Sequence, residues 1–270
     1  MKKTNKNERR RPKPPNAVRL VLLGILIALY VPLICVVAGA FRQTEGTGVF
    51  NWFGEVLGDD VMLEALWNSI LVGLCASLGA TVLGAGAAIA IHRGRFWGRP
   101  LLEILSYVSL VLPEIVFALA LLSWFFVLNI PLGLPTVIMA HITFSISYVI
   151  LTVGSRLASF DPSLDDAARD LGASELQVLW KITLPILGPS LVASFLLSFL
   201  LSFDDFLITF FVNGVGSDTL PVKLYAFMKI GITPKLNALA TMMWALTALV
   251  LFVSFRSPAF RGSLKGETET

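Results

Sequence analysis

The sequence predicts an all-α membrane protein with six transmembrane helices and both termini in the cytoplasm. Composition, the apolar runs and the distribution of basic residues lead to this fold class. Of 270 residues, 56% are hydrophobic and 14% are charged, and the mean hydropathy is +0.78. An average soluble domain is about a quarter charged. The composition therefore excludes a soluble enzyme, a disulfide scaffold and a disordered chain.

Six apolar runs are long enough to cross a bilayer, whose hydrocarbon core of about 30 Å requires about 20 helical residues. They are Leu20 to Phe41, Ala65 to Ile91, Leu101 to Leu128, Thr136 to Ser155, Ile186 to Val212 and Leu236 to Phe255. The chain thus divides into a basic tail over residues 1–19, a six-helix transmembrane domain over 20–256 and a second tail over 257–270. A cytoplasmic loop over 156–185 belongs to the transmembrane domain.

The basic residues fix the orientation. Seventeen of the 21 Lys and Arg lie in the two tails and in the connections after the second and fourth runs. The other side carries Arg42, Lys223, Lys229 and Lys235. The positive-inside rule therefore places both termini in the cytoplasm. The net charge of +3 is a topology signal, and we expect no nucleic-acid partner.

The first run has two interpretations. Its basic start and the small residues Ala38, Gly39 and Ala40 resemble a cleaved signal peptide, but the run is longer than a signal-peptide core, so we expect a permanent anchor. The external segment that follows contains Trp52 and Phe53, which is consistent with a short interfacial helix or with a simple loop.

Small residues recur along the second run at helical spacing, which allows close helix approach in lipid and predicts a place inside the bundle. They are Ser69, Gly73, Ser77, Thr81 and Ala85, with Ala80, Gly84 and Ala88 on an adjacent stripe. Cys35 and Cys75 also lie in apolar runs. We expect them to be packing residues rather than a disulfide or a metal site.

The loop over 156–185 is too polar to enter the bilayer. Asp161-Pro162-Ser163 predicts a helix start and Gly172 a helix end. A second short helix is expected from Ser174 to Leu184-Pro185. Together the two short helices form an elbow with an exposed apolar and acidic face. This face suits docking into a groove of another protein, or resting on lipid headgroups.

Three carboxylates lie well away from the ends of the runs, where burial at mid-bilayer costs at least ~2.5 kcal/mol, so each is a candidate functional residue. Glu114 follows Pro113, and a proline can open the backbone around a cavity. Asp204 lies about 100° away from Asp205 on a helix and is expected to pair with another helix or subunit. Asp205 is expected to line a translocation path, because it shares a polar helical face with Ser194, Ser198, Ser202 and Thr209.

Other readings of these groups remain open. Both aspartates could make structural hydrogen bonds to neighbouring helices, and carboxylates on a path suit an organic cation, a metal cation or a proton. His92 and His141 have no partner at metal-ligand spacing, so we expect packing or interface roles and no metal site. Some aromatic residues could offer faces to a cation or anchor the membrane interface: Trp124, Tyr148, Tyr225 and Trp244.

The cytoplasmic loop contains three elements at fixed spacing: Asp166-Ala167-Ala168, Gly172 and Ile182-Thr183-Leu184-Pro185. In this pattern the loop resembles the EAA loop of bacterial ABC-importer permeases. Asp166 stands where the family usually has Glu, so the charge is kept but the reach is one methylene shorter. The resemblance implies a type I, MetI-like bundle. It also implies a coupling helix that seats in a cleft of a cytoplasmic ATPase through Asp166, Ala167, Ala168, Gly172, Ile182 and Pro185.

Further segments of interest are Leu112-Pro113-Glu114-Ile115, Ser202-Phe203-Asp204-Asp205-Phe206, Thr219-Leu220-Pro221, Ile232-Thr233-Pro234 and Asn237-Ala238-Leu239-Ala240-Thr241. They look like the second permease subunit of spermidine/putrescine importers. This resemblance implies a polyamine pathway lined by Glu114, Asp204, Asp205 and Ser202. It also implies a second permease subunit, two ATPase subunits that bind ATP and Mg, and an external solute-binding protein.

The sequence contains neither a phosphate-binding P-loop nor a nucleophile motif, so we expect no enzyme activity and no cofactor bound by this chain. Two alternative functions remain. One is an ABC permease for another small organic solute. The other is a self-sufficient ion-coupled transporter, which the missing second copy of the Pro113-Glu114 and Asp204-Asp205 segments disfavours.

Overall fold

A computed structural model describes residues 16–42, 48, 50–94 and 96–256, and every regular element in these residues is helical. The predicted tails lie largely outside this part of the chain. The elements are α1 Asn16–Ala40, α2 Asn51–Leu57, α3 Asp60–Arg93, α4 Arg99–Val111, α5 Glu114–Val127, α6 Leu134–Ala158, α7 Ser163–Asp170, α8 Glu175–Val178, η1 Leu179–Thr183, α9 Leu184–Phe203, α10 Leu207–Val212, α11 Leu220–Ile230 and α12 Pro234–Arg256.

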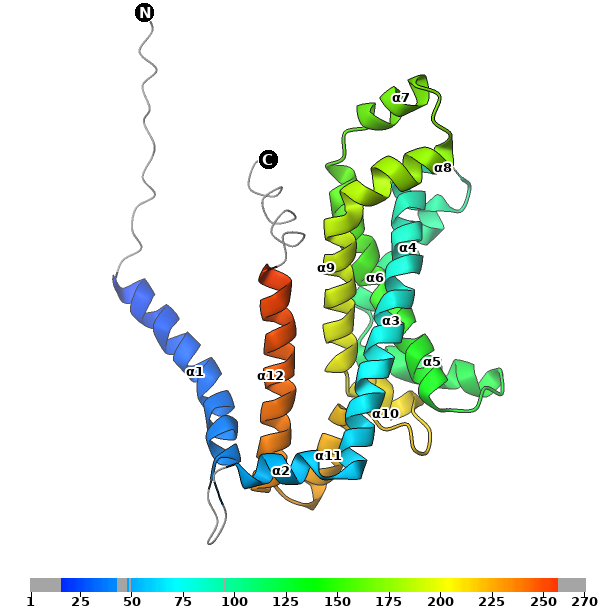
Figure 1. Ribbon diagram of the computed structural model, residues 1–270. Helices are drawn as coiled ribbons and strands as arrows, with labels where there is room; N and C mark the ends of the chain where they lie inside the picture. Colours follow the sequence, from blue (N-terminus) through cyan, green and yellow to red (C-terminus); the bar gives the residue numbers. More distant parts are fainter. Residues whose placement is uncertain (1–15, 43–47, 49, 95, 257–270) are drawn as a thin grey trace, which may run out of the picture.

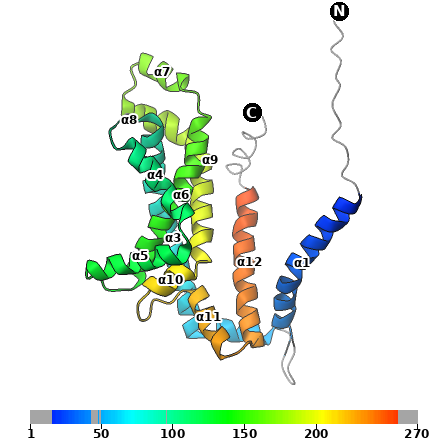
Figure 2. The same ribbon diagram turned by 180° about the vertical axis from the view of Figure 1, so that it is seen from behind.

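Five of the six predicted membrane crossings are confirmed as helices long and apolar enough to span a bilayer. The third run corresponds to α4 and α5, a pair bent by 115° that counts as a sixth span only if it forms one broken crossing rather than a re-entrant loop. The first residue of α1 and the last of α12 lie at the same end of the molecule as α7 and α8, while α2 and α11 lie at the opposite end (Figures 1 and 2). With the basic residues setting the orientation, α7 and α8 are cytoplasmic and α2 and α11 are external.

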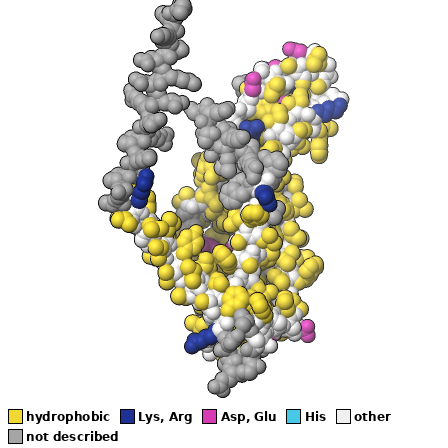
Figure 3. All heavy atoms as spheres, turned by 60° about the vertical axis from the view of Figure 1, so that its left-hand side comes forward, with side chains coloured by type: hydrophobic (Ala, Val, Ile, Leu, Met, Phe, Trp, Pro, Cys, Tyr) yellow, Lys and Arg dark blue, Asp and Glu magenta, His cyan; other side chains and the backbone are white. Residues whose placement is uncertain are grey.

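The membrane-facing surface is apolar. α1 carries exposed hydrophobic side chains along its length, and its main contacts are with α12. Hydrophobic side chains cover the middle of the molecule, and charged side chains gather toward its ends (Figure 3). Cys35 and Cys75 are free thiols exposed on α1 and α3. Neither is buried in the bundle, so the expectation that they are packing residues is not met within this chain.

α3 is the central helix, packed between α6 and α9. Its small residues allow close approach: a Cβ atom added at Gly84 would lie 2.6 Å from Cβ of Val149 on α6. A Cβ atom at Gly73 would lie 2.9 Å from the Phe199 ring on α9. The structure confirms the prediction that the second run lies inside the bundle.

The third apolar run is two helices rather than one. The chain leaves α4 at Leu112, whose ψ of 136° is extended, and α5 begins after Pro113. A proline has no backbone N–H and disfavours the helical conformation in the residue before it, so the helix ends there. This break places Glu114 at the first turn of α5.

The fifth run is also broken, at Asp204 to Phe206, where a continuous helix was expected. The Asp205 carboxylate accepts a hydrogen bond from the backbone N–H of Thr209 at 2.9 Å, so it satisfies a free donor at the start of α10. The buried polar side predicted from the helical stripe nevertheless persists: Ser194, Ser198, Ser202, Asp205 and Thr209 are all buried.

Two expected helices outside the membrane are present. α2 confirms the short external helix, and Trp52 Nε1 donates to the carbonyl oxygen of Arg42 at 3.0 Å. The predicted α7 starts at Ser163 and ends before Gly172, whose φ of +83° is a left-handed conformation that favours glycine.

The second short helix does not end at Leu184-Pro185 as expected. α8 continues through the π-helical turn η1 into α9. A π turn bonds residue i to residue i+5, and we attribute the continuation to this wider spacing, which accommodates the missing N–H of Pro185. We call residues 156–185, with α7, α8 and η1, the cytoplasmic elbow.

Candidate functional site

A cavity of about 770 Å³ lies where the two broken helices meet. Its wall combines carboxylates, aromatic rings and apolar side chains from α4, α5, α6, α9, α10 and α12. The residues on its polar side are Ser109, Glu114, Tyr148, Asp204, Asp205 and Thr247, and its aromatic side includes Phe117, Phe144 and Phe206. The predicted carboxylates are thus brought together from separate segments.

Two of the carboxylates are exposed. Glu114 is at the start of α5, and Asp204 directly follows α9. Asp204 accepts a hydrogen bond from the Thr247 hydroxyl on α12 at 3.3 Å. This contact agrees with the expectation that Asp204 pairs with another helix.

Asp205 lies deeper and is buried. Its Oδ2 atom accepts from the Thr209 hydroxyl at 2.9 Å and lies 3.1 Å from Nε2 of His141 on α6. The other ring nitrogen of His141 lies 2.6 Å from the hydroxyl oxygen of Ser202. These contacts fix one side of the Asp205 carboxylate, while Asp205 also contributes to the cavity wall. Ser202 does not line the cavity and reaches Asp205 only through His141.

Glu114 and Asp205 both line this cavity, so their carboxyl groups face the same space. Helix rotation could not be read from the sequence, so this proximity was unknown before. Three carboxyl groups facing one cavity form an acidic surface that suits cations with several hydrogen-bond donors. Of the aromatic residues considered from the sequence, Tyr148 lines the cavity, whereas Trp124, Tyr225 and Trp244 are not part of its wall.

Sequence reasoning missed the role of His141. Its side chain is 1% exposed and connects Ser202 to Asp205, although only a packing or interface role was expected. The available signal was an ionisable ring in the middle of an apolar span, because such groups are rare in the bilayer without a partner. His92, in contrast, places Nδ1 2.9 Å from the carbonyl oxygen of Ala88 within its own helix.

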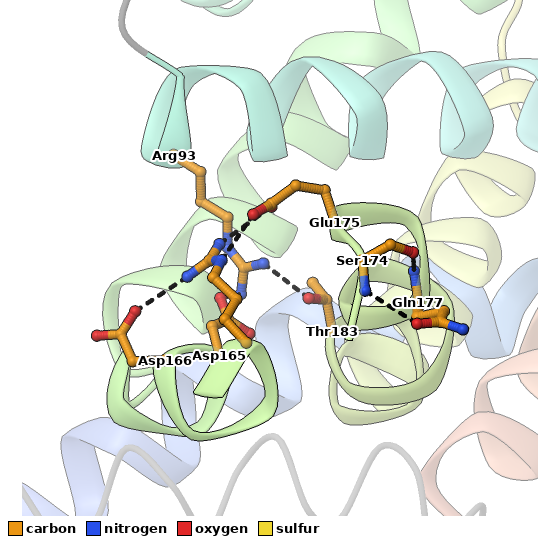
Figure 4. A network of polar contacts seen from close by, with 8 residues as sticks. Arg93, Asp165, Asp166, Ser174, Glu175, Gln177 and Thr183 are labelled. Carbon is orange, nitrogen blue, oxygen red and sulfur yellow. Dashed lines mark hydrogen bonds and ion pairs between the residues drawn. The ribbon is translucent and has the colours of Figure 1, made fainter. Parts of the chain in front are cut away.

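The cytoplasmic elbow forms a second candidate site. Asp166 is exposed and accepts a hydrogen bond from Arg169, which also holds the Glu175 carboxylate through Nε at 2.7 Å (Figure 4). The hydrogen bond from Arg169 lowers the pKa of Glu175, and the same contact raises the pKa of Arg169. The arrangement braces α7 against α8 and leaves the outer oxygen of Asp166 free to meet a partner.

The rest of the expected coupling set lies on the same elbow. Ala167, Gly172 and Pro185 are exposed, while Ala168 and Ile182 are half-buried. Leu171 and Leu176 add large apolar side chains that are 90% and 65% exposed. An apolar and acidic surface therefore projects from the cytoplasmic end of the molecule, as the sequence predicted.

Comparisons with known proteins give a family and a fold. Residues 80–263 match the family model described as "Binding-protein-dependent transport system inner membrane component". The spermidine/putrescine transport system permease protein PotC of Haemophilus influenzae is 37% identical over 84% of this chain and 90% of its own length. The putrescine transport system permease protein PotI of Escherichia coli K12 is 35% identical over 90% of each chain.

Solved structures support the same fold. The chain is similar, with a TM-score of 0.70 and 15% identity, to a chain of a bacterial alginate ABC transporter in complex with a periplasmic protein bound to an alginate pentasaccharide. The match covers 88% of this chain and 91% of that one. The inward-facing MetNI methionine ABC transporter is similar with a TM-score of 0.62, over 73% of this chain and 94% of that one. These likenesses confirm the expected MetI-like bundle.

Proposed function

Because the chain belongs to the family of binding-protein-dependent transport system inner membrane components, we propose that it forms half of the translocation pathway of an ATP-driven polyamine importer. The family places it in the cytoplasmic membrane as a multi-pass permease. Spermidine and putrescine are the solutes that the names of its relatives carry.

The observation that carries the substrate proposal is the acidic cavity. A polyamine presents several ammonium groups joined by apolar segments. Glu114, Asp204 and Asp205 offer three carboxyl groups, and the ring of Tyr148 offers an aromatic face beside them. Asp204 and Glu114 are the groups that an entering ammonium would meet, and Asp205, held by His141 and Thr209, would form the fixed end of the site.

The energy source is proposed to be a separate ATPase. The sequence has no P-loop, so ATP and Mg would bind to that partner, and this chain would not act as an enzyme. The elbow supplies the contact through Asp166, Ala167, Ala168, Gly172, Ile182 and Pro185. The exposed Leu171 and Leu176 would be covered when the partner binds.

The remaining partners are proposed from the same family. A second permease subunit would complete the pathway, two ATPase subunits would bind the two elbows, and an external solute-binding protein would deliver the polyamine. The presence of a periplasmic solute-bound protein on the alginate transporter, which shares this fold, supports the last of these.

The substrate test is uptake of labelled spermidine and putrescine by cells that express the complete transporter with Asp205→Asn. Losing a hydrogen bond to a charged group costs about 1.5–3 kcal/mol, so uptake at low polyamine concentration should fall by about 10- to 150-fold. Glu103→Gln, at an exposed carboxyl on α4 outside the cavity wall, is the matched control. Unchanged uptake by Asp205→Asn, at normal expression, would refute the assignment.

A further inference from the structure

Arg93, the last residue of α3, contacts both α7 and η1 of the cytoplasmic elbow. Its Nη2 atom lies 2.9 Å from Oδ2 of Asp165 on α7, and Nη1 donates a hydrogen bond to the Thr183 hydroxyl on η1 at 2.7 Å (Figure 4). The guanidinium carbon also lies 4.7 Å from the centre of the Phe160 ring, in the segment before α7. One side chain therefore joins α3, α7 and η1.

The Asp165 contact is the buried attachment of α7. Asp165 is 5% exposed and is the buried residue of α7, whose other side chains are exposed or half-buried. A buried carboxylate requires a partner, and removing that partner is strongly destabilising. Within the described residues, Arg93 is the basic residue at ion-pair distance from Asp165. Thr183 is fully buried as well.

The Arg169 contacts differ in both respects. Arg169, Asp166 and Glu175 are largely exposed, so solvent screens their attraction. These contacts also lie wholly within the elbow and hold α7 to α8. They stiffen the elbow, whereas Arg93 attaches it to the membrane bundle.

α3 connects this attachment to the external end of the molecule. The helix runs without a proline from Asp60 to Arg93 and is packed closely against α6 and α9. Near its other end, Ser69 Oγ accepts a hydrogen bond from the backbone N–H of Leu220, and Asn68 donates to the carbonyl oxygen of Asp218 at 3.1 Å. A displacement of Arg93 along the axis would therefore reach the external turn before α11, because a packed helix moves as a unit.

We propose that Arg93 is a positioning residue for energy coupling: it ties the cytoplasmic elbow to α3, so that movement of the elbow shifts α3 and with it the external turn. The proposal rests on the proposed function, since the ATPase is what moves the elbow. It assigns the link between the ATPase and the translocation pathway to the ion pair of Arg93 and Asp165, which the EAA pattern does not include.

The test uses the whole complex, with ATPase subunits and solute-binding protein, reconstituted in proteoliposomes. ATP hydrolysis and uptake of labelled spermidine are measured together for Arg93→Ala, Asp165→Ala and the double variant. Arg93→Ala should still copurify with the ATPase and hydrolyse ATP, while uptake per ATP falls about tenfold, within the usual range of coupling between sites. The double variant should lose no more than the single ones, because both remove the same contact.

Arg99→Ala is the matched control. Arg99 is an exposed cytoplasmic arginine at the first position of α4, with no ion pair among the described residues. Its uptake per ATP should equal that of the wild type. Should Arg93→Ala not assemble, Asp165→Asn and Thr183→Val keep the side-chain size and are expected to lower the same ratio.

Three results would overturn the proposal. They are an unchanged uptake per ATP in Arg93→Ala, an unchanged ratio in both size-conserving variants, and losses in the two single variants that multiply in the double variant. Failure of the underlying function would look different. In that case the wild-type chain would not copurify with an ATPase, or would show no ATP-dependent spermidine uptake.

Discussion

The close approach of α3 to α6 predicts that Gly84→Ala destabilises the bundle. The added Cβ atom would lie 2.6 Å from Cβ and 2.8 Å from Cγ1 of Val149, and 3.1 Å from the carbonyl oxygen of Ile146. Carbon atoms in contact normally lie about 3.5–4.0 Å apart. The two helices would therefore have to separate by roughly 1 Å at this point.

α3 cannot relieve this contact by shifting toward α9, because Gly73 already lies against the Phe199 ring on that side. Overpacking of this kind costs about 1–3 kcal/mol. For a chain of this size, such a loss lowers the midpoint of thermal unfolding by roughly 2–12 °C. The measurement is thermal unfolding of the purified complex in detergent, followed by loss of the intact complex.

Gly86→Ala is the control in the same helix. An added Cβ atom at Gly86 would meet nothing within 4 Å, and alanine is the better helix former, so this variant should be as stable as the wild type or slightly more stable. Val149→Ala in the Gly84→Ala background removes Cγ1 but leaves Cβ, so it should restore only part of the loss. Equal midpoints for Gly84→Ala and Gly86→Ala would refute the packing argument.

Three other predictions concern single contacts. His141→Leu should lower polyamine uptake several-fold without changing ATPase copurification, because a buried Asp205 oxygen loses a partner at a cost of about 1–3 kcal/mol. His141→Asn keeps a donor and should retain more uptake. Equal uptake by the two variants would contradict the proposal that His141 holds the Asp205 carboxylate. The hydrogen bond from Lys235 lowers the pKa of Asp59 below 3.8, so the contact stabilises the protein above that pH and the benefit disappears as pH falls through the lower folded value. Lys235→Met should therefore reduce the thermal midpoint at pH 6, and by progressively less as the pH falls below 3.8. A reduction that does not change with pH would argue against the ion pair. Gly172→Val should weaken ATPase copurification, since a β-branched residue at φ of +83° costs about 1–2 kcal/mol and would change the direction of α8 relative to α7. Unaltered copurification would show that this turn is not part of the contact with the ATPase.

The sequence predicted the membrane fold well because its signals are local. Apolar length, basic asymmetry and small-residue spacing identified the spans, their direction and the central position of α3. Gly172 identified the end of α7, and Pro113 marked the place where the backbone opens, although the third run was expected as one helix. Apolar length, small-residue spacing, proline and glycine depend on residues close together in the chain, and the basic asymmetry requires no contact between residues.

The sequence could not predict contacts that depend on helix rotation. The break after α9 was missed because nothing local marks it, and it depends on the Asp205 carboxylate meeting Thr209 and His141. The contact between Arg93 and Thr183 joins residues that are 90 positions apart. For the same reason the stripe containing Asp205 was found correctly, but its partner on α6 was not.

The π turn at η1 has a consequence for the direction in which the elbow leaves the bundle. Each residue of an α-helix turns the chain by about 100° around the helix axis. Removing one residue from Leu179–Thr183 would convert the turn to ordinary α-helix and rotate α7 and α8 by about that angle relative to α9. Asp165 would then face away from Arg93. The number of residues in η1 thus sets the rotation of the cytoplasmic elbow about the axis of α9. In-frame deletions there should be far less tolerated than substitutions.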